Sequence, residues 1–253
     1  MTHEFPSASG LTVAERVKHG SKIKASNVGF VVENPAGSRI WEIAKHSALW
    51  SRGADGQALC GLFSCSYCIY GSRLRKNTRF MANFDLTQLQ TCGHAGVTCG
   101  RPHASFSQTV RSAKERNEIP QPLLQEILLT WIGDFSADEC IVIDMFSGFG
   151  SVARACRRLG VHVFTNDIIS GHDARVDLRK RGGFEELLEM ALGSLQREPK
   201  HVLIFASHPC ETFSSVGVHY HRGRAGPTRK AVQHEKMARC LFDFLRIQSV
   251  NAW

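Results

Sequence analysis

The sequence lacks a long hydrophobic run, and none of its apolar stretches approaches the ~20 residues that a membrane-spanning helix needs. Its first residues have neither the basic start nor the apolar centre of a secretory signal peptide. Internal repeats and low-complexity segments are also missing, which excludes repeat architectures. We therefore expect an intracellular globular protein of the nucleus or cytoplasm, with no membrane partner.

Acidic residues are scarce relative to basic ones. The chain has 31 Lys and Arg against 23 Asp and Glu, a net charge of +8 and a pI of about 9.2. Such a charge suits a polyanionic partner such as nucleic acid, although solubility alone also explains it. The nine cysteines are an odd number scattered through apolar segments, so we expect reduced thiols rather than disulfides.

Apolar runs alternate with amphipathic stretches along most of the 253 residues. This pattern predicts an α/β fold, a mostly parallel sheet with helices on both faces. We expect strands at 28–32, 68–70, 79–81, 141–143, 161–164 and 202–205, helices at 12–24, 120–132, 152–159, 184–194 and 232–248, and a loop at 92–107. Ligands of such sheets bind beyond the carboxyl ends of the strands. Glu33, Asp144, Asp167 and Cys210 all lie at or just past predicted strand ends.

A glycine-rich turn at 144–150 follows one predicted strand and opens a helix. Gly148 and Gly150 permit a tight turn and a close approach of the backbone to a ligand. Asp167, at the end of the next strand, can accept hydrogen bonds from ribose hydroxyls. The full spacing G-x-G-x-x-G is missing, which disfavours an NAD site. The turn therefore predicts a nucleotide-like cofactor, with a purely structural turn as the alternative.

Cys210 follows a proline at the end of another predicted strand and precedes hydroxyl residues. A thiol in such a position can be exposed in a cleft and act as a nucleophile in its thiolate form. A lone cysteine is more often a small buried hydrophobic residue. Its sequence context favours the catalytic interpretation.

Both motifs resemble those of one enzyme family. The segment 144–150, Asp-Met-Phe-Ser-Gly-Phe-Gly, is similar to the S-adenosylmethionine-binding motif of cytosine-5 DNA methyltransferases. The segment 209–214, Pro-Cys-Glu-Thr-Phe-Ser, resembles the Pro-Cys-x-x-Phe-Ser nucleophile motif of that family. The segment 241–247 resembles the helix that leads, in the family, to a strand ending in Glu-Asn-Val.

The Glu-Asn element lies near the start of this chain, at Glu33 and Asn34, before a proline instead of the family's usual valine. The motif order thus resembles a circular permutation, as in plant domains-rearranged methyltransferases. The implied fold is class I methyltransferase-like (Rossmann-like) and circularly permuted. The implied organisation is an N-terminal extension at 1–27 and a catalytic domain at 28–253. The domain consists of a late-motif half (28–135), with a possible Cys/His-rich recognition insert at 84–116, and a cofactor and nucleophile half (136–253).

The resemblance implies methyl transfer from S-adenosylmethionine to C5 of cytosine in DNA, through a covalent Cys210 intermediate. Glu33 would hydrogen-bond the ring N3 and the exocyclic amine. Arg75 and Lys76 lie in a segment similar to the family's arginine motif, with Lys76 and Thr78 at the positions of two expected arginines. A target base in a duplex would be flipped out. The implied cofactor contacts are Asp144, Phe146, Ser147, Gly148, Gly150, Asp167, Asp177 and Pro209.

A basic, glycine-containing stretch follows Cys210. In the family the equivalent loop closes over the flipped base, and phosphate contact is the functional interpretation. A solvated surface loop is the alternative. The candidate nucleic-acid contacts are Arg222, Arg224, Arg229 and Lys230.

Cysteine and histidine side chains in the first half offer zinc ligands. Cys65-x-x-Cys68 has ligand spacing, and Cys92, Cys99, His94 and His103 follow within reach. Cys65 and Cys68 also flank a strand-like segment and can simply pack inside. We favour that interpretation, and so assign no metal site from the sequence.

Three other functions stay open. The same chemistry can act on RNA cytosine, although we favour DNA. A non-catalytic nucleic-acid-binding relic of a methyltransferase is a second possibility. A methyltransferase acting on adenine amino groups is disfavoured because those enzymes need no cysteine.

Overall fold

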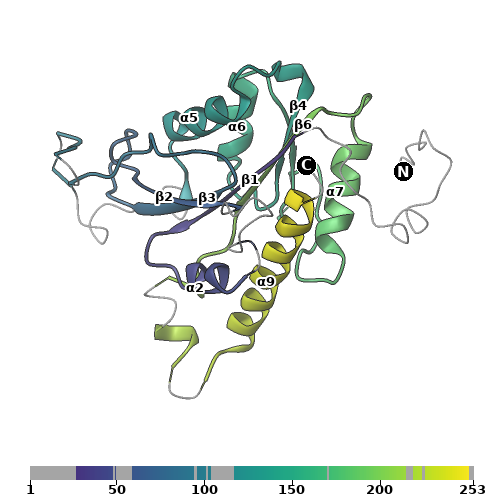
Figure 1. Cartoon of the computed structure of the whole chain (residues 1–253). Helices are drawn as coiled ribbons and strands as arrows, with labels where there is room; N and C mark the ends of the chain where they lie inside the picture. Colours follow the sequence, from purple (N-terminus) through teal and green to yellow (C-terminus); the bar gives the residue numbers. More distant parts are fainter. Residues whose placement is uncertain are drawn as a thin grey trace.

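The computed structural model describes residues 27–47, 49, 59–93, 96–100, 102–103, 117–169, 171–214, 219–223 and 226–250. Its centre is a six-stranded sheet in the order β2-β3-β1-β6-β4-β5 (Figure 1). The strands are β1 (Asn27–Pro35), β2 (Gly61–Ser66), β3 (Asn77–Ala82), β4 (Cys140–Asp144), β5 (His162–Thr165) and β6 (His201–Ser207). Strands β1, β6, β4 and β5 run parallel, whereas β3 is antiparallel to both β1 and β2. The expected α/β architecture with a mostly parallel sheet is confirmed.

Helices cover both faces of the sheet (Figure 1). Helices α5 (Gln121–Ile132) and α6 (Ser151–Arg158) share one apolar core with alternate strand residues such as Val142 and Leu203. Helices α2 (Ile40–Lys45), α7 (Gly183–Gly193) and α9 (Arg229–Val250) share a second core with Ile143 and Ile204. Because β6 and β4 contribute to both cores, their residues form continuous apolar runs rather than alternating ones.

The helix predicted at 120–132 shows how sequence spacing fixes an element. Leu123, Leu124, Ile127, Leu128 and Trp131 lie on one helical face, and all are buried. A proline in the first turn is compatible with a helix start, where the backbone N–H has no intrahelical partner. The helix therefore packs on the sheet as its pattern predicts.

Most other predicted elements are also present, within a few residues of the expected bounds. The strand expected at 68–70 is wrong, because these residues form turns and the strand β2 precedes them at Gly61–Ser66. The short helix α2 was not predicted. The helix expected at 12–24 lies outside the described residues.

The chain order of the strands creates a topological switch point at the carboxyl ends of β4 and β6. From β4 the chain passes through α6 to β5, and then returns through α7 to β6 on the other side of β4. Neighbouring loops therefore diverge at the carboxyl ends of β4 and β6, which is where open α/β sheets bind ligands. No helix in the described part of the chain is both long and apolar enough to cross a membrane.

Candidate active site

Glu33 lies near the carboxyl end of β1, opposite Ser207 at the end of the parallel strand β6. Its carboxylate is buried and held by three side chains. Tyr67 donates its hydroxyl to Oε1 at 3.0 Å, the Lys76 ammonium lies 3.5 Å from the same oxygen, and Ser207 donates to Oε2. A carboxylate has about four acceptor positions, so these three partners fix the orientation of Glu33.

Cys210 follows β6 and is half-buried. Its backbone carbonyl accepts hydrogen bonds from the amides of Phe213 and Ser214, so the thiol sits at the start of a tight turn. Burial raises the pKa of the thiol most, the Glu33 carboxylate raises it further, and the Lys76 ammonium lowers it. The sheet thus brings Glu33, Lys76 and Cys210 within electrostatic reach of one another.

Arg75 points elsewhere. Its guanidinium donates to the carbonyl oxygen of Cys92 at 2.9 Å. Neighbouring residues on an extended segment alternate in direction, so Lys76 reaches Glu33 while Arg75 holds the loop that contains Cys92. Of the two predicted residues, the structure brings Lys76 alone to Glu33.

The glycine turn joins β4 to α6. Gly148 and Gly150 have φ angles of +48° and +70°, a region that favours glycine, and no atom lies within 4 Å of a Cβ added at Gly148. The amide of Gly148 donates to Asp167 Oδ2 at 2.9 Å. The Ser147 hydroxyl donates to the Asp144 carbonyl at 3.0 Å. The turn is therefore rigidly built, with open space above its glycines.

Asp144 and Asp167 differ in environment. Asp144 is buried, and burial raises its pKa to about 7, with a further upward contribution from the Asp167 charge. Asp167 follows β5, and its other oxygen accepts the amide of Ile169. Asp167 is therefore the carboxylate presented at the turn, whereas Asp144 lies beneath it.

Exposed apolar side chains surround Asp167. Phe149, Ile168 and Ile169 have exposed fractions of 47%, 58% and 61%. Large exposed apolar residues beside polar groups are typical of ligand-binding surfaces. The sequence prediction missed Ile168 and Ile169, because exposure cannot be read from an apolar residue type alone.

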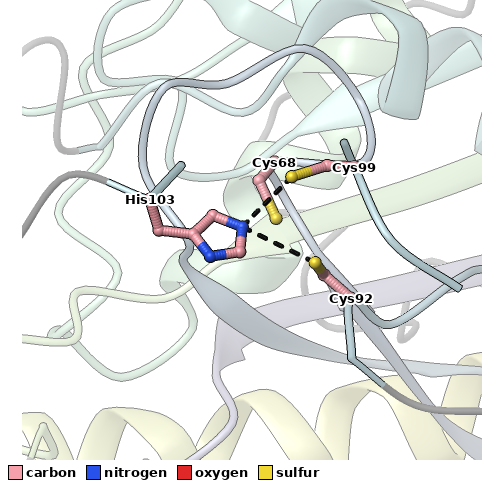
Figure 2. A group of neighbouring side chains, drawn as sticks. All are labelled: Cys68, Cys92, Cys99 and His103. Carbon is pink, nitrogen blue, oxygen red and sulfur yellow. Dashed lines mark hydrogen bonds between the residues drawn. The ribbon is translucent and has the colours of Figure 1, made fainter. Parts of the chain in front are cut away.

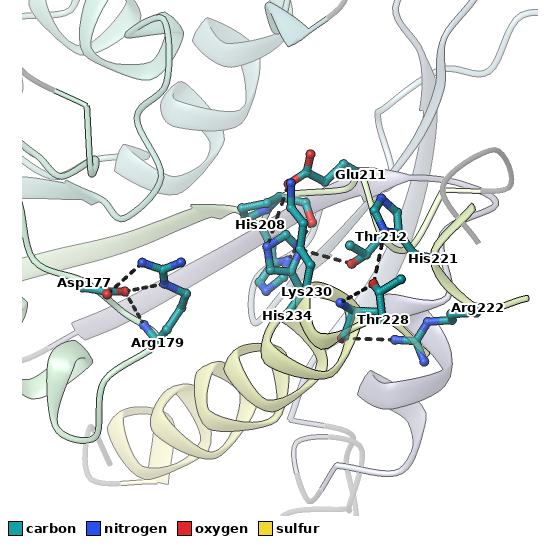
Figure 3. A network of polar contacts seen from close by, with 12 residues as sticks. Asp177, Arg179, His208, Glu211, Thr212, His221, Arg222, Thr228, Lys230 and His234 are labelled. Atoms are coloured by element: carbon teal, nitrogen blue, oxygen red, sulfur yellow. Dashed lines mark hydrogen bonds and ion pairs between the residues drawn. The ribbon is translucent and has the colours of Figure 1, made fainter. Parts of the chain in front are cut away.

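Asp177 lies in the connection between β5 and α7. Its carboxylate accepts two hydrogen bonds from the guanidinium of Arg179, at 2.8 and 2.9 Å (Figure 3). This pairing lowers the pKa of Asp177. The carboxylate is half-buried and already charge-compensated where the sequence predicts an adenine contact.

His208 and Pro209 lie between Ser207 and the thiol. The His208 imidazole is buried against the rings of Phe146, Phe213 and His234. Burial lowers its pKa to about 3, so the ring is neutral near pH 7. The Asn34 side chain donates to the His208 carbonyl at 2.8 Å, which ties the two strand ends together.

Of the predicted nucleic-acid contacts, the structure describes Arg222, Arg229 and Lys230. Arg229 and Lys230 begin α9, and Figure 3 shows Arg222 and Lys230 near this end of the helix. Arg222 is half-buried, forms an ion pair with Glu235 at 3.0 Å and lies over the Phe213 ring. Lys230 forms an exposed ion pair with Glu211 at 2.6 Å, and Arg229 is exposed. Arg224 lies outside the described residues. The loop after Cys210 is thus tied to α9 by charge, with Arg229 and Lys230 on the outside.

Two further residues, both bonded to Glu33, were missed by the sequence prediction. Tyr67 and Ser207 both bond the Glu33 carboxylate. Ser207 directly precedes the His-Pro-Cys segment, and its position opposite Glu33 follows only from the strand register. Tyr67 gives no sequence signal, because it reaches Glu33 through the turn after β2.

The zinc candidates separate in the structure. Cys65 is buried within β2, opposite Thr78 of β3, and belongs to the core. Cys68, Cys92 and Cys99 lie together with His103 instead. His94 is outside the described residues.

Neither a scan against protein-family models nor a search of curated proteins finds a match for this chain. The fold and the site define an α/β protein with a cysteine, a buried glutamate and a glycine turn at the carboxyl ends of neighbouring strands.

Proposed function

We propose that this protein is an S-adenosylmethionine-dependent cytosine-5 DNA methyltransferase with a circularly permuted class I methyltransferase-like fold. One observation carries the proposal. Glu33 lies near the carboxyl end of β1, Cys210 follows the adjacent parallel strand β6, and the glycine turn follows the next strand, β4. The two residues proposed as catalytic and the turn proposed for the cofactor thus lie at the carboxyl ends of neighbouring strands, near the switch point of the sheet.

The residues at the glycine turn fit the cofactor. Open space above Gly148 admits a ligand close to the backbone, and Asp167 presents a carboxylate to ribose hydroxyls. Ile168 offers an exposed apolar surface to an adenine ring. Bound S-adenosylmethionine supplies an electrophilic methyl group on a sulfonium centre. The predicted contacts Phe146, Ser147, Gly150 and Pro209 lie on the same turn or beside Cys210.

The protein's own groups carry the remaining chemistry. The Cys210 thiolate adds to C6 of the cytosine, and the electron pair of the C5–C6 double bond becomes available at C5. Glu33, protonated in this complex, donates to N3 and accepts from the exocyclic amine, which stabilises the developing charge on the ring. With the cofactor bound, C5 would take the methyl group as the methyl–sulfonium bond breaks and its electron pair stays on sulfur. C5 would then lose its proton to a base, and the thiolate would leave as the C5–C6 double bond re-forms.

The DNA partner is proposed from charge and from access. The chain has a net charge of +8, and Arg229 and Lys230 are exposed near the loop that follows Cys210. Such cations contact phosphates without regard to sequence. The cytosine of a duplex leaves its stack to reach Cys210.

The test is transfer of a labelled methyl group from S-adenosylmethionine to cytosine-containing DNA, with RNA of the same sequence in parallel. Wild type is compared with Cys210→Ser and with Cys240→Ser, which changes an exposed cysteine of α9. We expect transfer to DNA that Cys210→Ser reduces at least ~1000-fold, as loss of a nucleophile does. Cys240→Ser should keep wild-type activity.

Other outcomes contradict the proposal in distinct ways. Transfer to RNA alone identifies an RNA methyltransferase. Undiminished transfer by Cys210→Ser points to chemistry that needs no thiol. Cofactor binding without transfer to either substrate identifies a non-catalytic protein.

A further inference from the structure

Four side chains converge beyond the end of β2, outside the site described above (Figure 2). Cys68 lies in the turn after β2, and Cys92, Cys99 and His103 lie in the loop that follows β3. The Nε2 atom of His103 is 3.1 Å from Cys99 Sγ and 3.5 Å from Cys92 Sγ. All four potential ligand atoms lie within 4.8 Å of one another.

The two distances from His103 Nε2 are close to those between the ligands of one tetrahedral metal ion. Ligand atoms about 2.0–2.3 Å from a zinc ion are roughly 3.3–3.8 Å from each other. Three thiolates and one imidazole form a Cys₃His set, which selects zinc over the hard cations that prefer oxygen. We propose that Cys68, Cys92, Cys99 and His103 bind one structural Zn²⁺ ion. With four protein ligands the site is closed to water and substrate, so its role is structural rather than catalytic.

The surrounding chain explains why a metal would be needed here. The described residues between β3 and position 103 form no helix or strand. Leu86 and Leu89 are buried in the core shared with α5, but none of the described residues at 93 and 96–100 is buried. Small segments without a core of their own are commonly held by a metal ion. Zinc would join this loop to the turn after β2.

Hydrogen bonds from neighbouring residues already hold the loop that carries Cys92. The Cys92 amide donates to Ser66 Oγ at 3.0 Å, and Arg75 donates to the Cys92 carbonyl. A zinc ion with three thiolates has a net charge of −1, which the Arg75 guanidinium offsets. Such outer contacts orient metal ligands and strengthen binding.

The site is adjacent to the partners of Glu33. Cys68 directly follows Tyr67, and Arg75 directly precedes Lys76. A metal that fixes these turns also fixes Tyr67 and Lys76, two of the three side chains that hold the Glu33 carboxylate. Zinc binding itself follows from the four ligands and does not depend on the proposed methyl transfer.

The first measurement is metal analysis of the full chain, purified without a histidine tag and under reducing conditions. We expect one zinc per chain. Replacement of zinc by Co²⁺ should give the intense visible bands of a tetrahedral site and thiolate-to-cobalt charge transfer in the near ultraviolet. Metal-free protein with reduced thiols that gives no such spectrum on Co²⁺ addition would overturn the proposal.

Variants separate ligands from neighbours. Cys99→Ser and His103→Ala should lose at least 10-fold in zinc affinity. His103→Cys should retain zinc, because it restores a fourth ligand, whereas a purely packing role of the imidazole predicts no such rescue. Cys65→Ala is the matched control from the same Cys-x-x-Cys pair and should bind zinc as wild type does. Equal zinc affinity in Cys99→Ser, His103→Ala and wild type would sink the assignment.

Discussion

Cys210 is placed between two opposing charges. Glu33 disfavours its thiolate and Lys76 favours it, while burial disfavours any charge at this position. The pKa of the thiol is therefore above its ordinary value, and the thiol predominates at neutral pH. A nucleophile in this state gains reactivity as the pH rises, or as a bound ligand neutralises Glu33.

The reactivity of Cys210 tests this arrangement without substrate or cofactor. Glu33→Gln removes the nearby negative charge and should shift the pH midpoint of iodoacetamide alkylation downward. Lys76→Met removes the positive charge and should shift it upward. The midpoints are measured by mass spectrometry of the peptide containing Cys210, with alkylation of the exposed Cys240 as internal reference. Midpoints in both variants identical to that of wild type would show that neither charge acts on the thiol.

At the scale of elements, a buried titratable group lies at the carboxyl end of β4 and another just after β6, and burial shifts their pKa values in opposite directions. Burial raises the pKa of Asp144 to about 7 and lowers that of His208 to about 3. Between about pH 4 and 6.5 the folded state keeps a proton on Asp144 that the unfolded chain releases. The contribution of Asp144 to the free energy of unfolding therefore falls as the pH rises. Over the same pH range His208 takes up a proton in the unfolded chain but not in the folded state. The contribution of His208 to the free energy of unfolding therefore falls as the pH falls.

The two slopes oppose each other, each at about 1.4 kcal/mol per pH unit. Asp144→Asn should make the free energy of unfolding rise more steeply with pH than in wild type. His208→Phe, which keeps an aromatic ring among Phe146 and Phe213, should make it fall more steeply. Urea unfolding between about pH 4.5 and 6.5 measures both differences. Parallel pH dependences in wild type and both variants would contradict the shifts.

The type of most elements, helix or strand, could be predicted from the sequence, because the spacing of apolar residues indicates which faces are buried. The wrong strand at 68–70 shows the limit of that signal. Cys68, Ile69 and Tyr70 are apolar, and Cys68 and Tyr70 are buried, yet they form turns beside the Cys92 loop. Burial against an irregular loop produces the same apolar pattern as burial in a sheet.

At the scale of the whole molecule, β1 is the element that joins distant parts of the chain. It pairs with β3 on one side and with β6 on the other, and α5 packs over it. Gly29 is a point of close approach between β1 and α5. A Cβ there would meet Trp131 Nε1 at 2.5 Å and Leu203 Cδ1 at 3.1 Å.

Gly29→Ala should therefore destabilise the protein by about 1–3 kcal/mol, as overpacking does in a close-packed core. Gly37→Ala is the matched control, because no atom lies within 4 Å of its added Cβ. That variant should change the free energy of unfolding by less than about 0.5 kcal/mol. Denaturant unfolding of the two variants measures the difference, and equal stability would show that Trp131 gives way.

The sequence by itself determined the α/β class, most strands and helices, and the residues that end the central strands, because local spacing and turn chemistry specify them. It also contained both motifs on which the proposed function depends. Only the tertiary structure decided which of these residues meet. Strand order and register set Glu33 opposite Ser207 and near Cys210, turned Lys76 toward Glu33 and Arg75 toward Cys92, and grouped His103 with Cys68 rather than Cys65. These contacts join segments far apart in the chain, and no local pattern fixes them, because they depend on how the whole sheet assembles.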